Sequence, residues 1–254
     1  THIIYCFGRL DGNNLKVRSA RDSTTIMKMV SLKSKNPELK VLLSLGGWGG
    51  CKTCSDVFAT KKGRKDFVQS VKNYYEYFKV DGLDLDWEYP SVRGYPGHKY
   101  SPEDKQNFTK LVNELRKLGY QYELSFAAGG SPNYLDSAVQ WKKVMKKVDF
   151  VNLMTYDLSG PGSKIAAHHT GLYSTPEQPK SADFVVKYLI NLGIPREKII
   201  VGAAFYGKIF ENVDSINNGL SQPAKFKRTL NSELLTSWPK NKYFLAYCRK
   251  QEKR

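Results

Sequence analysis

Three carboxyl groups alternate with large apolar residues in the segment Asp81–Pro90, which reads Asp-Gly-Leu-Asp-Leu-Asp-Trp-Glu-Tyr-Pro. In an extended strand, Asp84, Asp86 and Glu88 project from one face. Neighbours on one face lie roughly 7 Å apart, so three ionised carboxylates would repel one another, and burying an unpaired one is costly. Repulsion and burial move the pKa values of neighbouring carboxyls apart. One carboxyl then stays protonated beside an ionised one, as acid catalysis requires. We therefore predict that Glu88 is a proton donor and that Asp86 is its partner.

Two other uses of clustered carboxyl groups fit these residues less well. Calcium and magnesium sites take oxygen ligands from glycine-containing turns on several sides of the ion, whereas Gly82–Trp87 is an apolar strand interrupted by acids. A solvated edge strand would turn its acids to water, but Leu83, Leu85 and Trp87 indicate that the opposite face is covered. The residues favour a catalytic or sugar-binding site, and we expect neither a metal nor a cofactor.

Apolar runs of strand length alternate along the chain with amphipathic segments of helix length. The runs are Ile3–Phe7, Val41–Leu45, Gly82–Trp87, Tyr122–Ala127, Phe150–Thr155 and Ile199–Phe205. The segments between them are Thr24–Leu39, Lys62–Val80, Pro102–Leu118, Trp141–Val148 and Ser181–Leu192. This alternation predicts a parallel sheet with helices outside it. We therefore predict an α/β fold of the (β/α)8 TIM-barrel type, with six recognisable βα units in the 254 residues.

Aromatic residues follow several of the predicted strands at their carboxyl ends. In a parallel sheet the loops leaving these ends converge, so a binding site is expected there. Aromatic rings offer stacking faces, and the neighbouring glycines let a ligand approach the backbone. Core packing would explain any one of these rings, but their shared position favours binding. The aromatic candidates are Trp48, Tyr89, Tyr156 and Tyr206.

The chain has 40 lysines and arginines against 24 acidic residues, a formal net charge of +16. Such an excess raises the possibility of nucleic-acid or membrane-surface binding. The lysines are scattered over helix-like segments, with some clustering at 225–228 and 249–254, and no nucleic-acid-binding motif accompanies them. No apolar run approaches membrane-spanning length. We therefore expect neither nucleic acid nor membrane as a partner.

The cysteines decide little about function. Cys51 and Cys54 form a Cys-x-x-Cys, but no second pair stands at the spacing of a zinc ribbon. A local disulfide in an exported protein, or two free thiols, fits the sequence better than thioredoxin-like redox chemistry. Cys6 lies within an apolar run and is expected to be a small core residue.

The motifs of this sequence resemble those of glycoside hydrolase family 18, the chitinases and their relatives. Asp81–Pro90 is a full match to the family signature Asp-x-x-Asp-x-Asp-x-Glu. The Ser-x-Gly-Gly motif at 44–47, the Met-x-Tyr-Asp motif at 154–157 and Phe-Tyr-Gly at 205–207 follow in the family's order. The resemblance covers roughly residues 1–210.

The resemblance implies a role for each matching residue. Glu88 resembles the acid that protonates the glycosidic oxygen, Asp86 the residue that orients the N-acetyl group, and Asp84 its partner in proton sharing. Tyr156 resembles the hydroxyl that hydrogen-bonds the N-acetyl group. In this family the acetamido oxygen of the substrate is the nucleophile, which gives net retention. Secondary substrate contacts are expected from Met154, Asp157 and Tyr206, together with Trp48 and Tyr89.

The resemblance implies hydrolysis of β-1,4-linked N-acetylglucosamine polymers, with chitin or its oligosaccharides as partner. Because the glutamate is present, the chain does not resemble the lectin members of the family. An endo-β-N-acetylglucosaminidase acting on N-glycans is the alternative enzyme. A further alternative is a fragment that binds carbohydrate but has little catalytic activity. The aromatic residues near the strand ends suit a stacking groove for a linear polymer and favour chitin.

The chain departs from the family barrel at both ends. Thr1–Phe7 resembles the second family strand and Ile199–Phe205 the seventh, so neither a first nor an eighth strand is recognised. Those two strands are neighbours in a closed barrel, and we expect an incomplete barrel. The expected division is a partial catalytic barrel over 1–207 and a divergent basic tail or insertion over 208–254. We expect a secreted, extracellular protein, although the first residues carry neither a basic leader nor a cleavage site.

Overall fold

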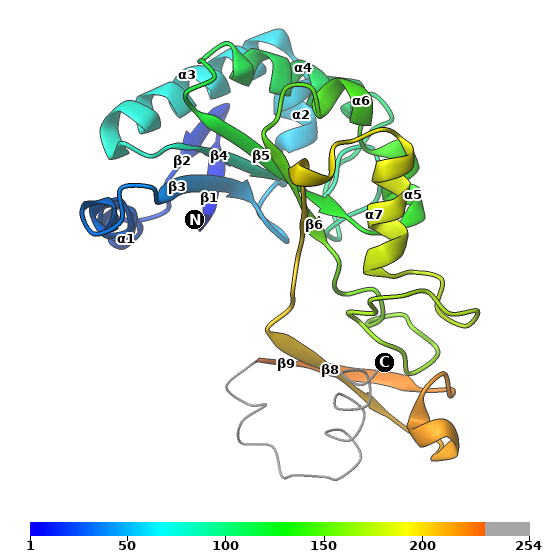
Figure 1. The fold of residues 1–254 in the computed structure, drawn as a ribbon. Helices are drawn as coiled ribbons and strands as arrows, with labels where there is room; N and C mark the ends of the chain where they lie inside the picture. Colours follow the sequence, from blue (N-terminus) through cyan, green and yellow to red (C-terminus); the bar gives the residue numbers. More distant parts are fainter. Residues whose placement is uncertain (232–254) are drawn as a thin grey trace. The chain divides into compact units, whose positions relative to one another are not determined.

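A computed structural model describes residues 1–231 of the chain (Figure 1). These residues form two compact units, which are described separately. The first comprises Thr1–Met154 and Val185–Val201, and the second comprises Thr155–Phe184 and the described part of Gly202–Arg254. The strand β8 (Tyr206–Glu211) runs across residue 207, and residues 232–254 of the expected tail lie outside the described residues. The division at residue 207 therefore stays a prediction.

The first unit is built on one sheet whose strands lie in the order β2-β1-β3-β4-β5-β6-β7. Neighbouring strands are parallel, except that β1 and β2 are antiparallel. This arrangement confirms the predicted α/β class, and a strand is present at each predicted position. The bounds are β1 (His2–Asp11), β2 (Asn14–Lys16), β3 (Lys40–Gly46), β4 (Gly82–Asp86), β5 (Glu123–Gly129), β6 (Phe150–Met154) and β7 (Ile199–Val201).

The helices alternate with these strands as predicted, and α2, α3, α4 and α6 lie over one face of the sheet (Figure 1). Two short helices, α2 and α5, had no counterpart in the predicted pattern. The α-helices are α1 (Ala20–Ser31), α2 (Cys54–Ala59), α3 (Lys61–Phe78), α4 (Asp104–Arg116), α5 (Pro132–Ser137), α6 (Trp141–Val144) and α7 (Ala182–Asn191). Short 3-10 helices are η1 (Leu32–Ser34), η2 (Arg196–Lys198) and η3 (Ile216–Gly219). None of the helices within the described residues has the length and apolar character that a membrane crossing requires.

The core between sheet and helices is centred on the apolar residues of β4. Leu83 and Leu85 are buried, as is Trp87 just after the strand. The Trp87 ring packs against Phe58 of α2 at 5.5 Å and Phe108 of α4 at 6.3 Å between ring centroids. This packing confirms that the face opposite the carboxyl groups is covered. Because strand side chains alternate, it holds Asp84 and Asp86 on the other face.

The strand ends differ from the prediction. β1, for example, continues to Asp11 rather than ending at Phe7. β4 ends at Asp86 rather than at Trp87. β7 ends at Val201 rather than at Phe205, because only Ile199–Val201 pairs with β6. The next carbonyl, that of Gly202, accepts a hydrogen bond from the Thr155 hydroxyl at 2.7 Å instead of joining the sheet.

The prediction that Cys6 is a core residue is wrong. Its side chain is exposed. The charges of Asp84 and Asp86 act on its thiol, which places Cys6 on the carboxyl-bearing face of the sheet and not on the face that the helices cover. An apolar sequence around a cysteine therefore does not decide which face of a parallel strand carries it.

The second unit contains an antiparallel pair of strands. β8 pairs with β9 (Lys225–Asn231), from Tyr206 opposite Asn231 to Glu211 opposite Lys225. The segment between them includes η3 and touches the preceding loop through a bridge between Ile165 and Pro223. This pair carries Tyr206 and Lys208, whose contacts within the second unit are described below.

Candidate active site

Asp84 is held by donors from three neighbouring strands. The sheet register places Ser44 of β3 and Ser125 of β5 directly beside it. The Ser44 hydroxyl donates to Oδ2 at 2.8 Å, and the Ser125 hydroxyl donates to Oδ1 at 2.6 Å. Asn152 of β6 adds an amide N–H···Oδ1 bond of 3.0 Å. Burial nevertheless raises the pKa of Asp84, and the three donors only oppose that effect.

Asp86 has a different environment, although it is the next residue on the same face. Its Oδ1 atom is buried and accepts no hydrogen bond within the part of the chain that the structure describes. Burial, followed by the negative charges of Glu88 and Asp84, raises the pKa of Asp86 to about 8. Asp86 is therefore protonated at neutral pH. The spacing of Asp84, Asp86 and Glu88 predicted that one of these carboxyls stays protonated near neutral pH, and Asp86 is such a carboxyl.

Glu88 lies just beyond the end of β4 and is buried together with Asp86 and Asp84, at 8 %, 8 % and 4 % exposure. Burial, the charge of Glu88 and a hydrogen bond with Glu88 raise the pKa of the adjacent Tyr89. Tyr134 of α5 packs edge-on against Tyr89 at 5.2 Å. Burial and the charges of Asp86 and Glu88 raise the pKa of Tyr134 as well. The hydroxyls of Tyr89 and Tyr134 therefore both lie close enough to Asp86 and Glu88 for the carboxylate charges to affect them.

The alternatives for the carboxyl group can now be compared with the structure. The strand β4 lies between β3 and β5, so it is not a solvated edge strand. No group of three or more histidine, cysteine, aspartate and glutamate side chains within the described residues is arranged to hold a metal ion. Within the sheet, Asp86 is a buried neutral carboxyl with Asp84 and Glu88 as buried neighbours.

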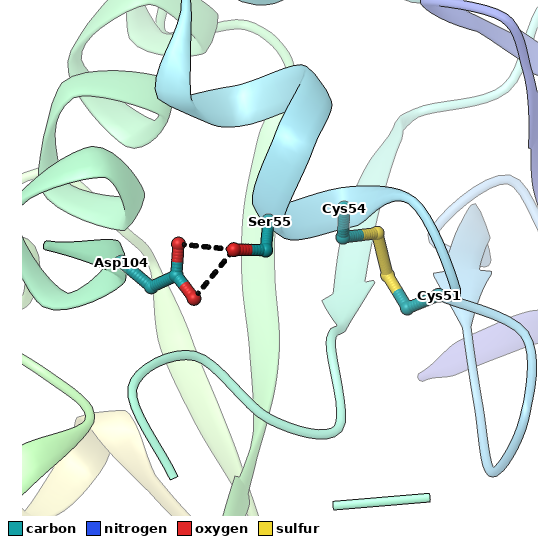
Figure 2. Close-up of a disulfide and its surroundings, with 4 residues drawn as sticks. All are labelled: Cys51, Cys54, Ser55 and Asp104. Atoms are coloured by element: carbon teal, nitrogen blue, oxygen red, sulfur yellow. Dashed lines mark hydrogen bonds between the residues drawn. A yellow bond between two sulfur atoms is a disulfide. The ribbon is translucent and has the colours of Figure 1, made fainter. Parts of the chain in front are cut away.

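The loop after β3 is built onto the end of the carboxyl-bearing strand. The Gly47 N–H donates to the Asp86 carbonyl oxygen at 2.9 Å. Trp48 follows, with its side chain exposed. Cys51 and Cys54 form a disulfide, which decides between the two states that the sequence left open (Figure 2). The disulfide therefore closes a short loop a few residues after Gly47, which contacts β4.

Helix α2, which begins at Cys54, is tied to α4 by a buried hydrogen bond. The Ser55 hydroxyl lies 2.9 and 3.0 Å from the two carboxylate oxygens of Asp104, whose side chain points at it from α4 (Figure 2). Asp104 also accepts from the Ser101 N–H at 2.8 Å, and burial raises its pKa. Since α4 follows the loop that leaves β4, this bond links the loop after β3 to the loop after β4.

In the second unit, the remaining predicted residues gather around Lys208. The Lys208 ammonium group lies 2.6 Å from Asp157 Oδ1 and 5.2 Å from the centroid of the Tyr206 ring. The His169 ring stacks on Tyr206 at 5.2 Å, and its Nε2 lies 3.1 Å from the Tyr206 carbonyl oxygen. Tyr156 packs edge-on against Tyr206 at 6.1 Å. Burial lowers the pKa of His169, so this ring is neutral at physiological pH.

The predicted site residues therefore form two groups, one in each unit. Asp84, Asp86, Glu88 and Tyr89 lie together in the first unit, with Trp48 on the adjoining loop. Met154 ends β6, with Gly129 at the end of β5 as its neighbour in the sheet register. The second group contains Tyr156, Asp157 and Tyr206.

Several residues that contact the predicted ones were not identified from the sequence. Ser125 and Asn152 are polar residues inside apolar strands, and that contrast was a usable signal. Tyr134, His169 and Lys208 lie in segments without a recognisable pattern, and no local signal distinguishes them. All five become apparent only through what they contact.

Comparisons with known proteins agree with this geometry. The sequence model of Glycosyl hydrolases family 18 matches residues 1–253. Mouse Chitotriosidase-1 is 33 % identical over 240 residues, which are 88 % of this chain and 50 % of that protein. The chain thus spans about half the length of this relative.

Solved structures give the same result. Chitinase ChiW from Paenibacillus sp. str. FPU-7 superposes with a TM-score of 0.85 at 35 % identity, over 93 % of this chain and 31 % of that chain. A glycoside hydrolase family 18 N-acetylglucosaminidase from Paenibacillus barengoltzii superposes with a TM-score of 0.84 at 33 % identity, over 95 % of this chain and 73 % of that chain. These matches confirm the predicted TIM-barrel type of fold. With a family match over nearly its whole length, this chain belongs to glycosyl hydrolase family 18.

Proposed function

We propose that this protein hydrolyses β-1,4-linked N-acetylglucosamine polymers with the carboxyl groups of β4. The observation that carries the proposal is the state of Asp86: buried, neutral near pH 7, and with an Oδ1 atom that has no partner among the described residues. A substrate amide would supply the missing donor. The buried neighbours Asp84 and Glu88 provide two further positions for protons.

The proposed reaction is the substrate-assisted one that the family resemblance implies. Glu88 donates its proton to the glycosidic oxygen, and the bond between that oxygen and the sugar C1 atom breaks. The acetamido oxygen of the same sugar attacks C1 and forms an oxazolinium ion, so the protein needs no second carboxylate as nucleophile. Asp86 accepts a hydrogen bond from the acetamido N–H and orients the group. Water then attacks C1 while Glu88 takes back a proton, which gives the retained product.

Asp84 serves as the proton partner of Asp86 in this scheme. Its carboxylate is stabilised by three donors, whereas Asp86 Oδ1 has none, so a proton shared between them favours Asp86. Tyr156 is assigned to the acetamido carbonyl. Met154, Asp157 and Tyr206, together with Trp48 and Tyr89, are assigned to substrate binding.

Chitin is the substrate that this proposal favours over N-glycans. The mouse relative is named a chitotriosidase, and ChiW is named a chitinase. The exposed Trp48 ring suits stacking on successive units of a linear polymer. Secretion is supported by the Cys51–Cys54 disulfide, since disulfides persist mainly in oxidising compartments.

The test is the release of N-acetylated sugars from chitohexaose by the chain and by its Glu88→Gln variant. General acid–base catalysis contributes roughly a hundredfold to ten-thousandfold in rate, so the variant is expected to lose at least about a hundredfold in kcat. Glu76→Gln is the matched control, because Glu76 is an exposed glutamate of α3. Its activity is expected to equal that of the unsubstituted chain.

The same assay separates the alternatives. Release of glycans from a glycoprotein, with chitohexaose left intact, would replace chitin by N-glycans as substrate. Binding to insoluble chitin without turnover by the unsubstituted chain would indicate a binding fragment. Unchanged kcat in Glu88→Gln, with the fold confirmed by circular dichroism, would contradict the assignment of Glu88 as the acid.

A further inference from the structure

His169 contacts both Tyr206 and the loop that carries Asp157, two of the residues assigned to substrate binding. Its side chain is only 12 % exposed. The ring stacks on the Tyr206 ring at 5.2 Å with an interplanar angle of 29°, and its Nε2 atom lies 3.1 Å from the Tyr206 carbonyl oxygen. The Leu158 N–H donates to the His169 carbonyl oxygen at 3.1 Å. His169 therefore joins β8 to the loop that follows β6.

The contact with Tyr206 determines the tautomer of the neutral ring. A carbonyl oxygen only accepts hydrogen bonds, so Nε2 carries the hydrogen and Nδ1 is a bare acceptor. Nδ1 is buried and has no hydrogen-bond partner among the described residues. It lies 3.9 Å from Asp157 Oδ1, which is also an acceptor. The neutral ring therefore donates nothing to the Asp157 carboxylate.

The same Asp157 oxygen is held by Lys208 of β8. The Lys208 ammonium group lies 2.6 Å from Asp157 Oδ1 and 3.0 Å from the Thr229 hydroxyl, and its side chain is only 8 % exposed. A second proton on the His169 ring, at Nδ1, would make that ring a competing donor for Asp157 Oδ1. It would also place two positive charges beside one carboxylate. The protonation state of His169 therefore decides whether Lys208 is the sole cation beside this carboxylate in the described part of the second unit.

We propose that His169 is a positioning residue: its neutral ring holds Tyr206 and leaves the Asp157 carboxylate to Lys208, and a proton on Nδ1 disrupts this arrangement. The proposal rests on the proposed function, which assigns Tyr206 and Asp157 to substrate binding. The groups that act on His169 are Asp157 from the loop after β6, Lys208 from β8 and the neighbouring His168. Burial lowers the pKa of His169 against the opposing effect of Asp157, so the ring takes its second proton only below about pH 6.5.

The first test reads the tautomer directly. Long-range proton–nitrogen NMR correlations distinguish the two neutral forms of a histidine ring from the charged one, and the signals lost in His169→Gln identify this residue among the four histidines. At about pH 7.5 we expect the Nε2–H form, with the second proton added only below about pH 6.5. An Nδ1–H form or a charged ring at about pH 7.5 would overturn the proposal.

The second test follows chitohexaose binding with pH by isothermal titration calorimetry in the Glu88→Gln background. His169→Gln can place an amide N–H near the position of Nε2 but cannot take up a proton. It is expected to keep the affinity of the Glu88→Gln parent at about pH 7.5 and to bind about threefold to tenfold more tightly than the parent at about pH 4.5, the scale of one lost hydrogen bond. His169→Ala lacks both ring and donor and is expected to bind about tenfold more weakly than the parent at about pH 7.5.

His2→Gln is the matched control. The His2 ring lies 2.7 Å from Glu123 Oε2 at the start of β1, and a glutamine can keep that hydrogen bond. This variant is expected to follow the pH profile of the parent. If His169→Gln also followed the parent at every pH, or if His169→Ala kept the parent affinity, the positioning role would be overturned while hydrolysis by Glu88 would stand. An unsubstituted chain that neither cleaves nor binds chitohexaose would overturn the proposed function itself.

Discussion

At the scale of the residue, the site depends on two aspartates that share a strand face and differ in their partners. Asp84 accepts hydrogen bonds from Ser44, Ser125 and Asn152. Asp86 Oδ1 accepts none among the described residues. Both are buried, so the difference in donors, rather than in burial, distinguishes them. The structure thus keeps a neutral carboxyl, that of Asp86, next to a buried one that accepts three hydrogen bonds.

The raised pKa of Asp86 makes a prediction about stability. The folded pKa of about 8 lies above the ordinary value near 4, so between these pH values the folded chain holds a proton that the unfolded chain releases. The contribution of Asp86 is therefore fully present below about pH 4 and is lost as the pH rises towards about 8. Asp86→Asn removes this dependence. As the pH rises from about 4 to about 8, the unfolding free energy of the unsubstituted chain should fall by at least about 2 kcal/mol more than that of the variant.

Urea unfolding at about pH 4 and about pH 8 measures this difference. Asp214→Asn, at an exposed aspartate, is the control and should follow the unsubstituted chain at both pH values. Parallel pH profiles for Asp86→Asn and the unsubstituted chain would show that Asp86 is ionised in the folded protein.

At the scale of the element, the two loops that leave β3 and β4 act as one structure. The loop after β3 carries the disulfide, and α2 behind it is joined to α4 by the Ser55–Asp104 hydrogen bond (Figure 2). The loop after β4 carries Tyr95, which contacts Trp48 across the gap in sequence. β3 and β4 therefore end in loops that are held to each other by side-chain contacts.

Removal of the disulfide tests this connection. Closing so short a loop is worth about 2 kcal/mol of unfolding free energy by the chain-entropy estimate, so Cys51→Ser combined with Cys54→Ser should lower the stability by about that amount. The apparent KM for chitohexaose should rise, because Trp48 is less well held, while kcat should change little. Chemical unfolding and steady-state kinetics measure the two effects.

The exposed cysteine provides the control for that experiment. Cys6→Ser removes a thiol that forms no disulfide, and it should leave both stability and KM unchanged. If the double serine variant lowered kcat and left KM unchanged, the disulfide would act on the carboxyl groups of β4 and not on Trp48.

At the scale of the whole molecule, the net charge of +16 is not used by the proposed reaction. Chitin oligosaccharides are uncharged, so screening by salt should not weaken their binding. The dissociation constant of chitohexaose with Glu88→Gln should therefore change less than about twofold between about 0.05 and 0.5 M salt. Calorimetric titrations at the two salt concentrations give the comparison.

Heparin, an anionic polymer, is the control ligand for the same titration. Any binding of heparin to the basic surface should weaken steeply with salt, as electrostatic association does. A steep loss of chitohexaose binding with salt would mean that the positive charge, rather than the aromatic and carboxyl groups, holds the ligand.

Much of this protein can be predicted from its sequence because the relevant patterns are local. The alternation of Leu83, Leu85 and Trp87 with the acids determines which side chains share a face. The spacing of apolar runs determines the parallel sheet. Strand ends are less certain, and β7 ended four residues early because its pairing with β6 stops at Val201. The expectation that Cys6 is a core residue was wrong for a different reason, because its apolar neighbours do not specify the orientation of its side chain.

The sequence by itself determined the fold class, the positions of six parallel strands along the chain and the shared strand face of Asp84 and Asp86. Only the tertiary structure decided which groups meet them. Ser125 and Asn152 reach Asp84 through strand register, which no single segment encodes. Tyr134 arrives from α5, which is distant in sequence from β4. Burial on both sides of β4 then raises the pKa of Asp86, because that cost depends on everything packed around the carboxyl and not on the residues beside it in the chain.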